Sequence, residues 1–307
     1  MATIAAEPST PIFVMRRRTW LQSLWATARR KPVGAAAGLV CILLVLIAVF
    51  ADLLAPYEPG QVGRGIPRLQ SPSADYPFGT DNLFRDQFSR IIVGARISLG
   101  IGFGAVAIGT VFGTVLGLLA GYFRGWVDMT TSRFIEVVLG FPPLVFALFF
   151  LAIFKTDQNY TLESFLWVSL AIGIIITPTT ARIVRGSTLG IRNLQYIEAA
   201  EAIGNTAPRI MFRHVLPNVV APIIVIASIQ IGNAILAEAA LSFLGQGIAD
   251  DSHPSWGKML QDTRQFWQEA WWVSVVPGAA ISLAVLSFNL FGDALRDVLD
   301  PRLRSSS

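Results

Sequence analysis

The chain has 307 residues, of which 53% are hydrophobic and only 14% are charged, and its formal net charge is +4. Because soluble domains carry about 25% charged residues, this composition excludes an ordinary globular protein covered by water. The single cysteine, Cys41, excludes an internal disulfide, and the two distant histidines, His214 and His253, form no metal-binding motif with it. We therefore expect no metal site.

Six long apolar blocks recur along the chain, each long enough for the roughly 20 helical residues that cross a bilayer. The first block is longer than the ~7–15-residue core of a signal peptide and lacks a clear cleavage site, so we expect a retained anchor. Pro178 and Pro222 weaken the fourth and fifth blocks, although membrane helices tolerate proline. The sequence thus predicts an all-α polytopic membrane protein with six transmembrane helices, at residues 35–54, 97–120, 134–154, 164–184, 218–241 and 271–292.

The distribution of Lys and Arg among the loops predicts the orientation. With the N-terminus inside, the inside segments carry 16 of the 24 basic residues, so we expect both termini in the cytoplasm. The longest inside connection is then 187–217. We divide the chain into a cytoplasmic tail at 1–34, a first transmembrane helix at 35–54, an extracytoplasmic loop at 55–93, a core domain with five transmembrane helices at 94–293 and a second cytoplasmic tail at 294–307.

The second apolar block carries glycine at every fourth position, at Gly109, Gly113, Gly117 and Gly121. Glycines four residues apart lie on one face of a helix and allow the backbone of another helix to approach closely. The pattern predicts tight helix packing in a bundle, but it does not identify which bundle.

The connection 187–217 has apolar residues at helical spacing, among them Ile197, Ala200 and Ile203. Gly204 and the asparagine after it can end one helix, and Pro208 suits the first turn of another. We expect one or two short amphipathic helices, closed by 216–217. Periodicity alone leaves two interpretations open, a helix lying on lipid or a docking element for a cytoplasmic partner.

This connection resembles the EAA loop of permeases of binding-protein-dependent ABC importers. The resemblance rests on one set of residues: Glu198, Ala199, Ala200, then Gly204, then a stretch that includes Arg213 and ends in Leu216 and Pro217. Further segments, at 78–99, 121–128, 237–257 and 289–302, resemble the C-type permease subunit of the dipeptide, oligopeptide and nickel branch. The similarity runs from about residue 30 to 304. One departure is Phe84, where the family usually has glycine.

The resemblance implies a type I ABC importer permease with a MetI-like bundle in the bacterial inner membrane. Such a subunit forms half of the path for di- or oligopeptides or peptide-like solutes. Its partners are a second homologous permease, one or two cytoplasmic ATPase subunits and an extracytoplasmic solute-binding protein. Nickel chelates, glutathione, opines and haem remain alternative substrates. The EAA loop is expected to couple this chain to the ATPases.

The chain contains no Gly-x-x-x-x-Gly-Lys-Ser/Thr loop, the motif that binds nucleotide phosphates. We therefore expect a non-catalytic subunit that binds no cofactor, with ATP and magnesium held by the partner ATPases. A membrane-embedded enzyme is disfavoured because no nucleophile with a base, paired aspartate or zinc motif is present. An autonomous channel or secondary carrier is a remote alternative, since no midplane charge accompanies Pro178. We expect no nucleic-acid partner.

Two acidic residues near the membrane, Glu136 and Glu238, are candidates for the substrate path or a gate. The alternative is that both are solvated or cap a helix at interfacial depth. We interpret Arg90 and Arg96 as interfacial residues. Four tryptophans fit an interfacial aromatic belt, Trp256, Trp267, Trp271 and Trp272.

Overall fold

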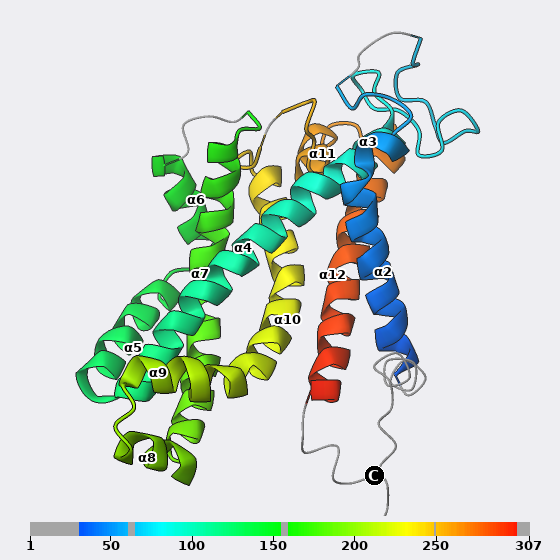
Figure 1. Ribbon diagram of the computed structural model, residues 1–307. Coiled ribbons are helices and arrows are strands. Elements are labelled where there is room, and N and C mark those ends of the chain that lie inside the picture. The colour runs from blue at the N-terminus through cyan, green and yellow to red at the C-terminus, as the bar shows by residue number, and fades with distance from the viewer. Residues whose placement is uncertain (1–30, 61–64, 155–158, 249, 300–307) are drawn as a thin grey trace, which may run out of the picture.

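The computed structural model describes residues 31–60, 65–154, 159–248 and 250–299. This part of the chain consists of helices and loops with one isolated β-bridge, between Thr80 and Asp86. The helices are α2 (Pro32–Val49), α3 (Ala51–Leu54), α4 (Gln87–Phe123), α5 (Gly125–Leu139), α6 (Pro143–Phe154), α7 (Leu162–Arg192), α8 (Gln195–Ala202), α9 (Ala207–Ile210), a π-helical turn η1 (Met211–Val215), α10 (Leu216–Phe243), α11 (Trp256–Asp262) and α12 (Trp272–Leu299). Figure 1 shows α8 at one end of the molecule, the α8 end, and α11 at the other, the α11 end.

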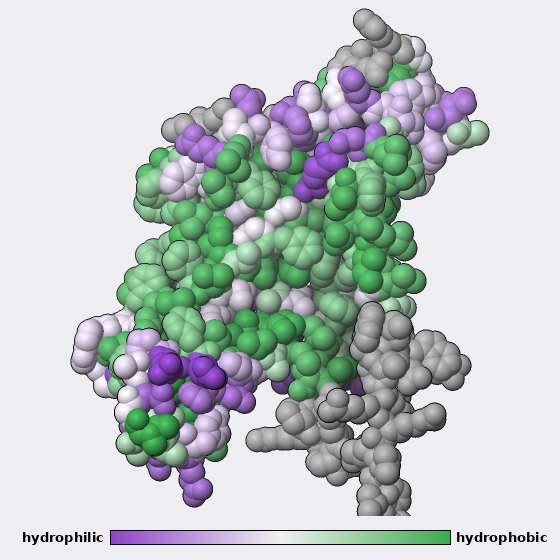
Figure 2. Space-filling model, in the orientation of Figure 1, coloured by the Kyte–Doolittle hydropathy of each residue, from purple (hydrophilic) through white to green (hydrophobic). Residues whose placement is uncertain are grey.

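Five helical segments of the described chain are long and apolar enough to cross a membrane, namely α2, α4, α7, the run from α9 through α10, and α12. A sixth crossing results if α5 and α6 together count as one span. On the face that Figure 2 shows, a broad apolar band crosses the middle of the molecule between two polar ends. This arrangement confirms the predicted all-helical membrane fold.

The third predicted span, 134–154, is not one uninterrupted helix. The chain bends by 90° between α5 and α6. Pro142 and Pro143 lie at the bend, where they remove two backbone donors and push the preceding residue out of the helical region. Pro178 and Pro222, in contrast, lie inside continuous helices. An adjacent pair of prolines therefore ends the helix, whereas the isolated prolines do not.

Several boundaries also differ from those predicted. Helix α4 begins at Gln87, because the Asp86 carboxylate accepts a hydrogen bond from the Ser89 backbone N–H at 2.8 Å and caps the helix. Helix α12 continues to Leu299, so residues 294–299 of the expected C-terminal tail are helical. The remainder of both expected tails, 1–30 and 300–307, lies outside the described residues.

The segment 216–217 does not close the connection before α10. Helix α9 passes through η1 directly into α10, and Pro217 occupies the first turn of α10. Proline is tolerated at this point because the preceding π-helical turn changes the local hydrogen-bond register, which accommodates a residue without a backbone N–H. The short helix and the spanning helix are thus one continuous element.

Candidate functional site

The candidate coupling site is the segment from α8 to η1, which joins α7 to α10. Helix α8 ends where Gly204 adopts a φ of +84° and the Asn205 backbone N–H donates to the Ala200 carbonyl at 3.1 Å. The Asn205 side chain donates to the same carbonyl. A left-handed residue after a helix favours glycine, so the backbone conformation accounts for Gly204. The next helix begins at Ala207, with Pro208 in its first turn.

The two faces of α8 have different environments. Ile197 and Ala200 are buried against side chains of α4, α7, η1 and α10 in one apolar cluster. Glu198 and Ala199 are exposed on the outward side. Ile203, which the periodicity placed with the apolar face, is 81% exposed because the helix ends before it.

The remaining predicted coupling residues lie along the same segment. Arg213 and Pro217 are exposed, and Leu216 is half-buried. Phe212 beside them is 67% exposed. Large exposed apolar side chains within a polar surface are typical of interaction sites. The α8 end therefore presents apolar side chains with charged neighbours, Glu198 and Arg213.

Helix α4 packs on α7 through its glycine face, and these two helices share the most extensive contact in the fold. A Cβ atom added at Gly109 or Gly117 would lie 2.7 Å or less from atoms of α7. The same holds for Gly121, which faces Thr188 at 2.6 Å. Real Cβ atoms need more space than this, so the glycines permit the close approach of the two backbones.

The two acidic candidates for the path have opposite environments. Glu136 of α5 is 52% exposed and forms an ion pair with Arg133 at 2.8 Å. Glu238 of α10 is fully buried inside the subunit, and its carboxylate accepts a hydrogen bond from the Ser242 hydroxyl at 2.6 Å. Glu136 is therefore accessible in this conformation and Glu238 is not.

A buried charge cluster at the α11 end was missed by the sequence reasoning. The Arg85 Nε lies 2.6 Å from the Asp81 carboxylate, and both side chains are at most 2% exposed. Arg90, predicted to be interfacial, is 1% exposed. The Nη2 atoms of Arg85 and Arg90 each lie 3.6 Å from the carboxylate of Asp262 in α11. Asp251 contacts Arg85 from the solvent side at 2.6 Å. Buried charges require such partners, and only the fold brings them together.

Two of the four tryptophans assigned to an aromatic belt are instead buried. The Trp256 ring is 1% exposed and its Nε1–H donates to the Ile91 carbonyl at 3.0 Å. Trp272 is 7% exposed and donates to the Thr80 carbonyl. The belt prediction is wrong for these two residues, because they pack the loops of the α11 end onto α4 and α12. Trp267 and Trp271 are exposed.

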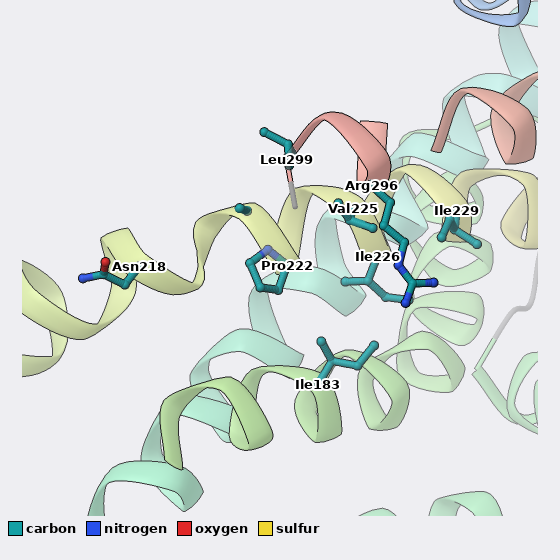
Figure 3. A pocket seen from close by; sticks show the side chains of 9 residues that line it. Ile183, Asn218, Pro222, Val225, Ile226, Ile229, Arg296 and Leu299 are labelled. Carbon is teal, nitrogen blue, oxygen red and sulfur yellow. The ribbon is translucent and has the colours of Figure 1, made fainter. Parts of the chain in front are cut away.

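A cavity of about 550 Å³ opens between α7, α10 and α12 toward the α8 end. Figure 3 shows Arg296 extending from α12 across apolar side chains of α10 toward Ile183 of α7. Arg296 is the charged member among the described residues that line the cavity, which is otherwise mostly apolar. A mostly apolar lining with few polar groups is typical of small-molecule sites.

The described residues thus form a bundle of membrane-length helices with the candidate coupling segment at the α8 end. Residues 113–305 match the family model of the binding-protein-dependent transport system inner membrane component. Residues 19–72 match the N-terminal TM domain of oligopeptide transport permease C. The chain belongs to this family of permeases and is a non-catalytic subunit of an ABC importer in the inner membrane.

Curated relatives match over nearly the whole chain. The dipeptide transport system permease protein DppC of Alkalihalophilus pseudofirmus is 46% identical, over 90% of this chain and 88% of the relative. The glutathione transport system permease protein GsiD of Pectobacterium atrosepticum is 42% identical, over 94% and 93%. The inward-facing MetNI methionine ABC transporter has a similar fold, with a TM-score of 0.57 at 17% identity, over 69% of this chain and 97% of the matched chain.

Proposed function

We propose that this permease carries di- or oligopeptides, or small peptide-like solutes such as glutathione. The support is the identity of 46% to a dipeptide permease and 42% to a glutathione permease, each over most of both chains. Both named solutes contain peptide bonds and free carboxylates. The Arg296 side chain in the mostly apolar cavity matches such a solute, since a guanidinium binds carboxylates well.

The chain works with partners that complete the importer. We propose a second homologous permease, one or two ATPases that bind ATP and magnesium, and an extracytoplasmic solute-binding protein. The two permeases together enclose the path, with the cavity at Arg296 and the exposed Glu136 on the path side. A path role for Glu238 would require α10 to separate from α4 and from the start of α11, since its carboxylate is buried against Ser98 and Ser255.

The burial of the apolar face of α8 carries the coupling proposal. A helix that lies on lipid must present its apolar face to the lipid. Here Ile197 and Ala200 pack inside the subunit, so the outward face of α8 carries Glu198 and Ala199, and the exposed Ile203 follows the end of the helix. That surface suits a groove in a partner protein. We therefore assign α8, with Gly204 at its end, to ATPase docking.

The docking assignment also gives an orientation. Because ATPases are cytoplasmic, the α8 end faces the cytoplasm. The start of α2 and the end of α12 meet at this end, where Lys31 and Asp297 form an ion pair at 2.7 Å. Both termini then lie inside, and the loop before α4 and helix α11 lie outside, where the binding protein delivers solute. The core domain of five spanning segments extends from α4 through α12.

A gentle detergent pull-down of the tagged chain from its native membrane tests this proposal. We expect a second permease and Walker-type ATPases to co-purify, and the cognate binding protein to bind a peptide in calorimetry. A chain that purifies alone in several detergents would contradict the partners. A binding protein that takes a nickel chelate or haem in preference to peptides would contradict the substrate class.

A further inference from the structure

Three side chains from three helices meet at the α8 end. Tyr122 lies in the last turn of α4, Arg192 is the last residue of α7, and Glu201 lies on α8. The Tyr122 hydroxyl donates to the Glu201 carboxylate at 3.0 Å, and an Arg192 Nη1 lies 2.8 Å from the same oxygen. The Arg192 Nε also donates to the Tyr122 backbone carbonyl at 3.1 Å.

Arg192 makes three contacts within this group of residues. Its guanidinium lies over the Tyr122 ring, 4.7 Å from the centroid, so a cation–π contact adds to the hydrogen bond with the Tyr122 carbonyl and to the ion pair with Glu201. The cation also sits at the C-terminal end of α7, where the helix dipole favours positive charge. Arg192 is 26% exposed and Glu201 37%. The contact is thus partly shielded and geometrically specific, unlike a mobile surface ion pair.

The connection from α8 to α10 has fewer polar contacts than the connection from α8 to α4 and α7. It runs through Gly204, where an added Cβ atom would have no other atom within 4 Å, and then through the π-helical turn η1. Among the described residues, α8 and α10 are joined by a hydrogen bond on the exposed surface, which the Asn218 side-chain amide donates to the Tyr196 hydroxyl at 3.4 Å. Helices α4 and α7, in contrast, form a stiff pair along the glycine face.

We propose that Tyr122, Arg192 and Glu201 form a clamp that makes α8 move together with α4 and α7. The clamp rests on the proposed docking of ATPases to α8. When the ATPases displace α8, the clamp transfers the displacement to the ends of both spanning helices, and Gly204 and η1 absorb the change toward α10. The three residues are positioning residues, distinct from Glu198, which faces the ATPase.

The test uses the complete importer reconstituted in liposomes with its binding protein. Tyr122→Phe, Glu201→Gln and Arg192→Gln are compared with Arg124→Gln, which removes an exposed hydrogen bond from the end of α4 to Asn193 at the end of α7 and leaves α8 unchanged. We expect the first three to keep the ATPases bound but to lower solute uptake per ATP hydrolysed on the order of tenfold, a range typical of coupling between sites. Arg124→Gln should transport like the wild type.

A double-mutant cycle decides whether Arg192 and Glu201 act as one unit. If they do, the double variant Arg192→Gln/Glu201→Gln should lose no more uptake per ATP than either single variant. Additive losses, loss of ATPase binding, or equal damage from Arg124→Gln would each overturn the clamp. Arg192→Lys, which retains the charge, should recover part of the coupling. A wild-type complex that binds no ATPase would instead overturn the proposed function, and the clamp with it.

Discussion

Gly113 of α4 lies so close to Thr180 of α7 that a Cβ atom at position 113 would sit 2.6 Å from the Thr180 Cβ. The Thr177 carbonyl oxygen would lie 2.9 Å away, so a backbone would have to move. The α4–α7 pair is therefore held at a separation that only glycine allows. This pair forms the stiff part of the bundle between the α8 end and the α11 end.

Gly113→Ala should destabilise the protein by about 1–3 kcal/mol, the usual cost of forcing an extra methyl group into a packed interior. Gly190→Ala is the matched control, because it lies in α7 with no atom within 4 Å of the added Cβ. Thermal unfolding of the detergent-solubilised chain measures both. Equal melting temperatures for the two variants would show that the contact is not tight in solution.

Asp81→Ala should destabilise the loop before α4 strongly, by about 3–5 kcal/mol, because it leaves Arg85 and Arg90 buried with less compensating charge. Asp251→Ala removes another partner of Arg85, but this carboxylate is 60% exposed. It should cost under about 1 kcal/mol. Urea or thermal unfolding compares the variants. A similar cost for both would mean that the cluster is hydrated.

Phe84→Gly should stabilise the loop slightly. Phe84 has a φ of +60°, a conformation that costs a residue with a Cβ about 1–2 kcal/mol. Loss of its partly buried ring offsets part of this gain, so we expect a net increase of about 0.5 kcal/mol. The control, Leu83→Gly, has similar exposure and no positive φ, and should be destabilising. If both variants changed the melting temperature in the same direction, backbone strain at Phe84 would be refuted.

Gly204→Val should abolish uptake while the chain remains inserted, because valine cannot adopt the φ of +84° that ends α8 without strain of about 1–3 kcal/mol. Gly204→Asn is the control, since asparagine adopts left-handed conformations readily. Uptake and ATPase co-purification are measured for both. Uptake by the valine variant at the wild-type rate would remove the turn from the coupling site.

Glu198→Lys should release the ATPases, because it reverses the charge on the outward face of α8. Glu163→Lys makes the same reversal at an exposed glutamate at the start of α7, near the other end of the molecule. Only the first variant should lose ATPases in the pull-down. Retention by both would place the docking surface elsewhere, while loss by both would indicate general damage to the fold.

Much of the fold could be predicted because membrane insertion depends on local composition. Long apolar blocks predict spanning helices wherever they occur, and five of the six blocks form such helices. The break at 204–205 and the helix with Pro208 in its first turn were also predictable, since glycine and proline act through their own backbones. The third block was not, because whether a proline ends or merely interrupts a helix depends on the neighbours that can satisfy its lost hydrogen bond.

The sequence by itself determined the class of protein, five of the six spanning segments and the position of the candidate coupling segment, because each depends on residues adjacent in the chain. The tertiary structure decided which charges are buried and which side chains of distant helices meet. Arg90 looks like any interfacial arginine until α11 brings Asp262 beside it. Glu201 looks like a surface residue of a short helix until α4 and α7 bring Tyr122 and Arg192 to it. Contacts between residues so far apart in sequence follow from helix packing, which no local pattern records.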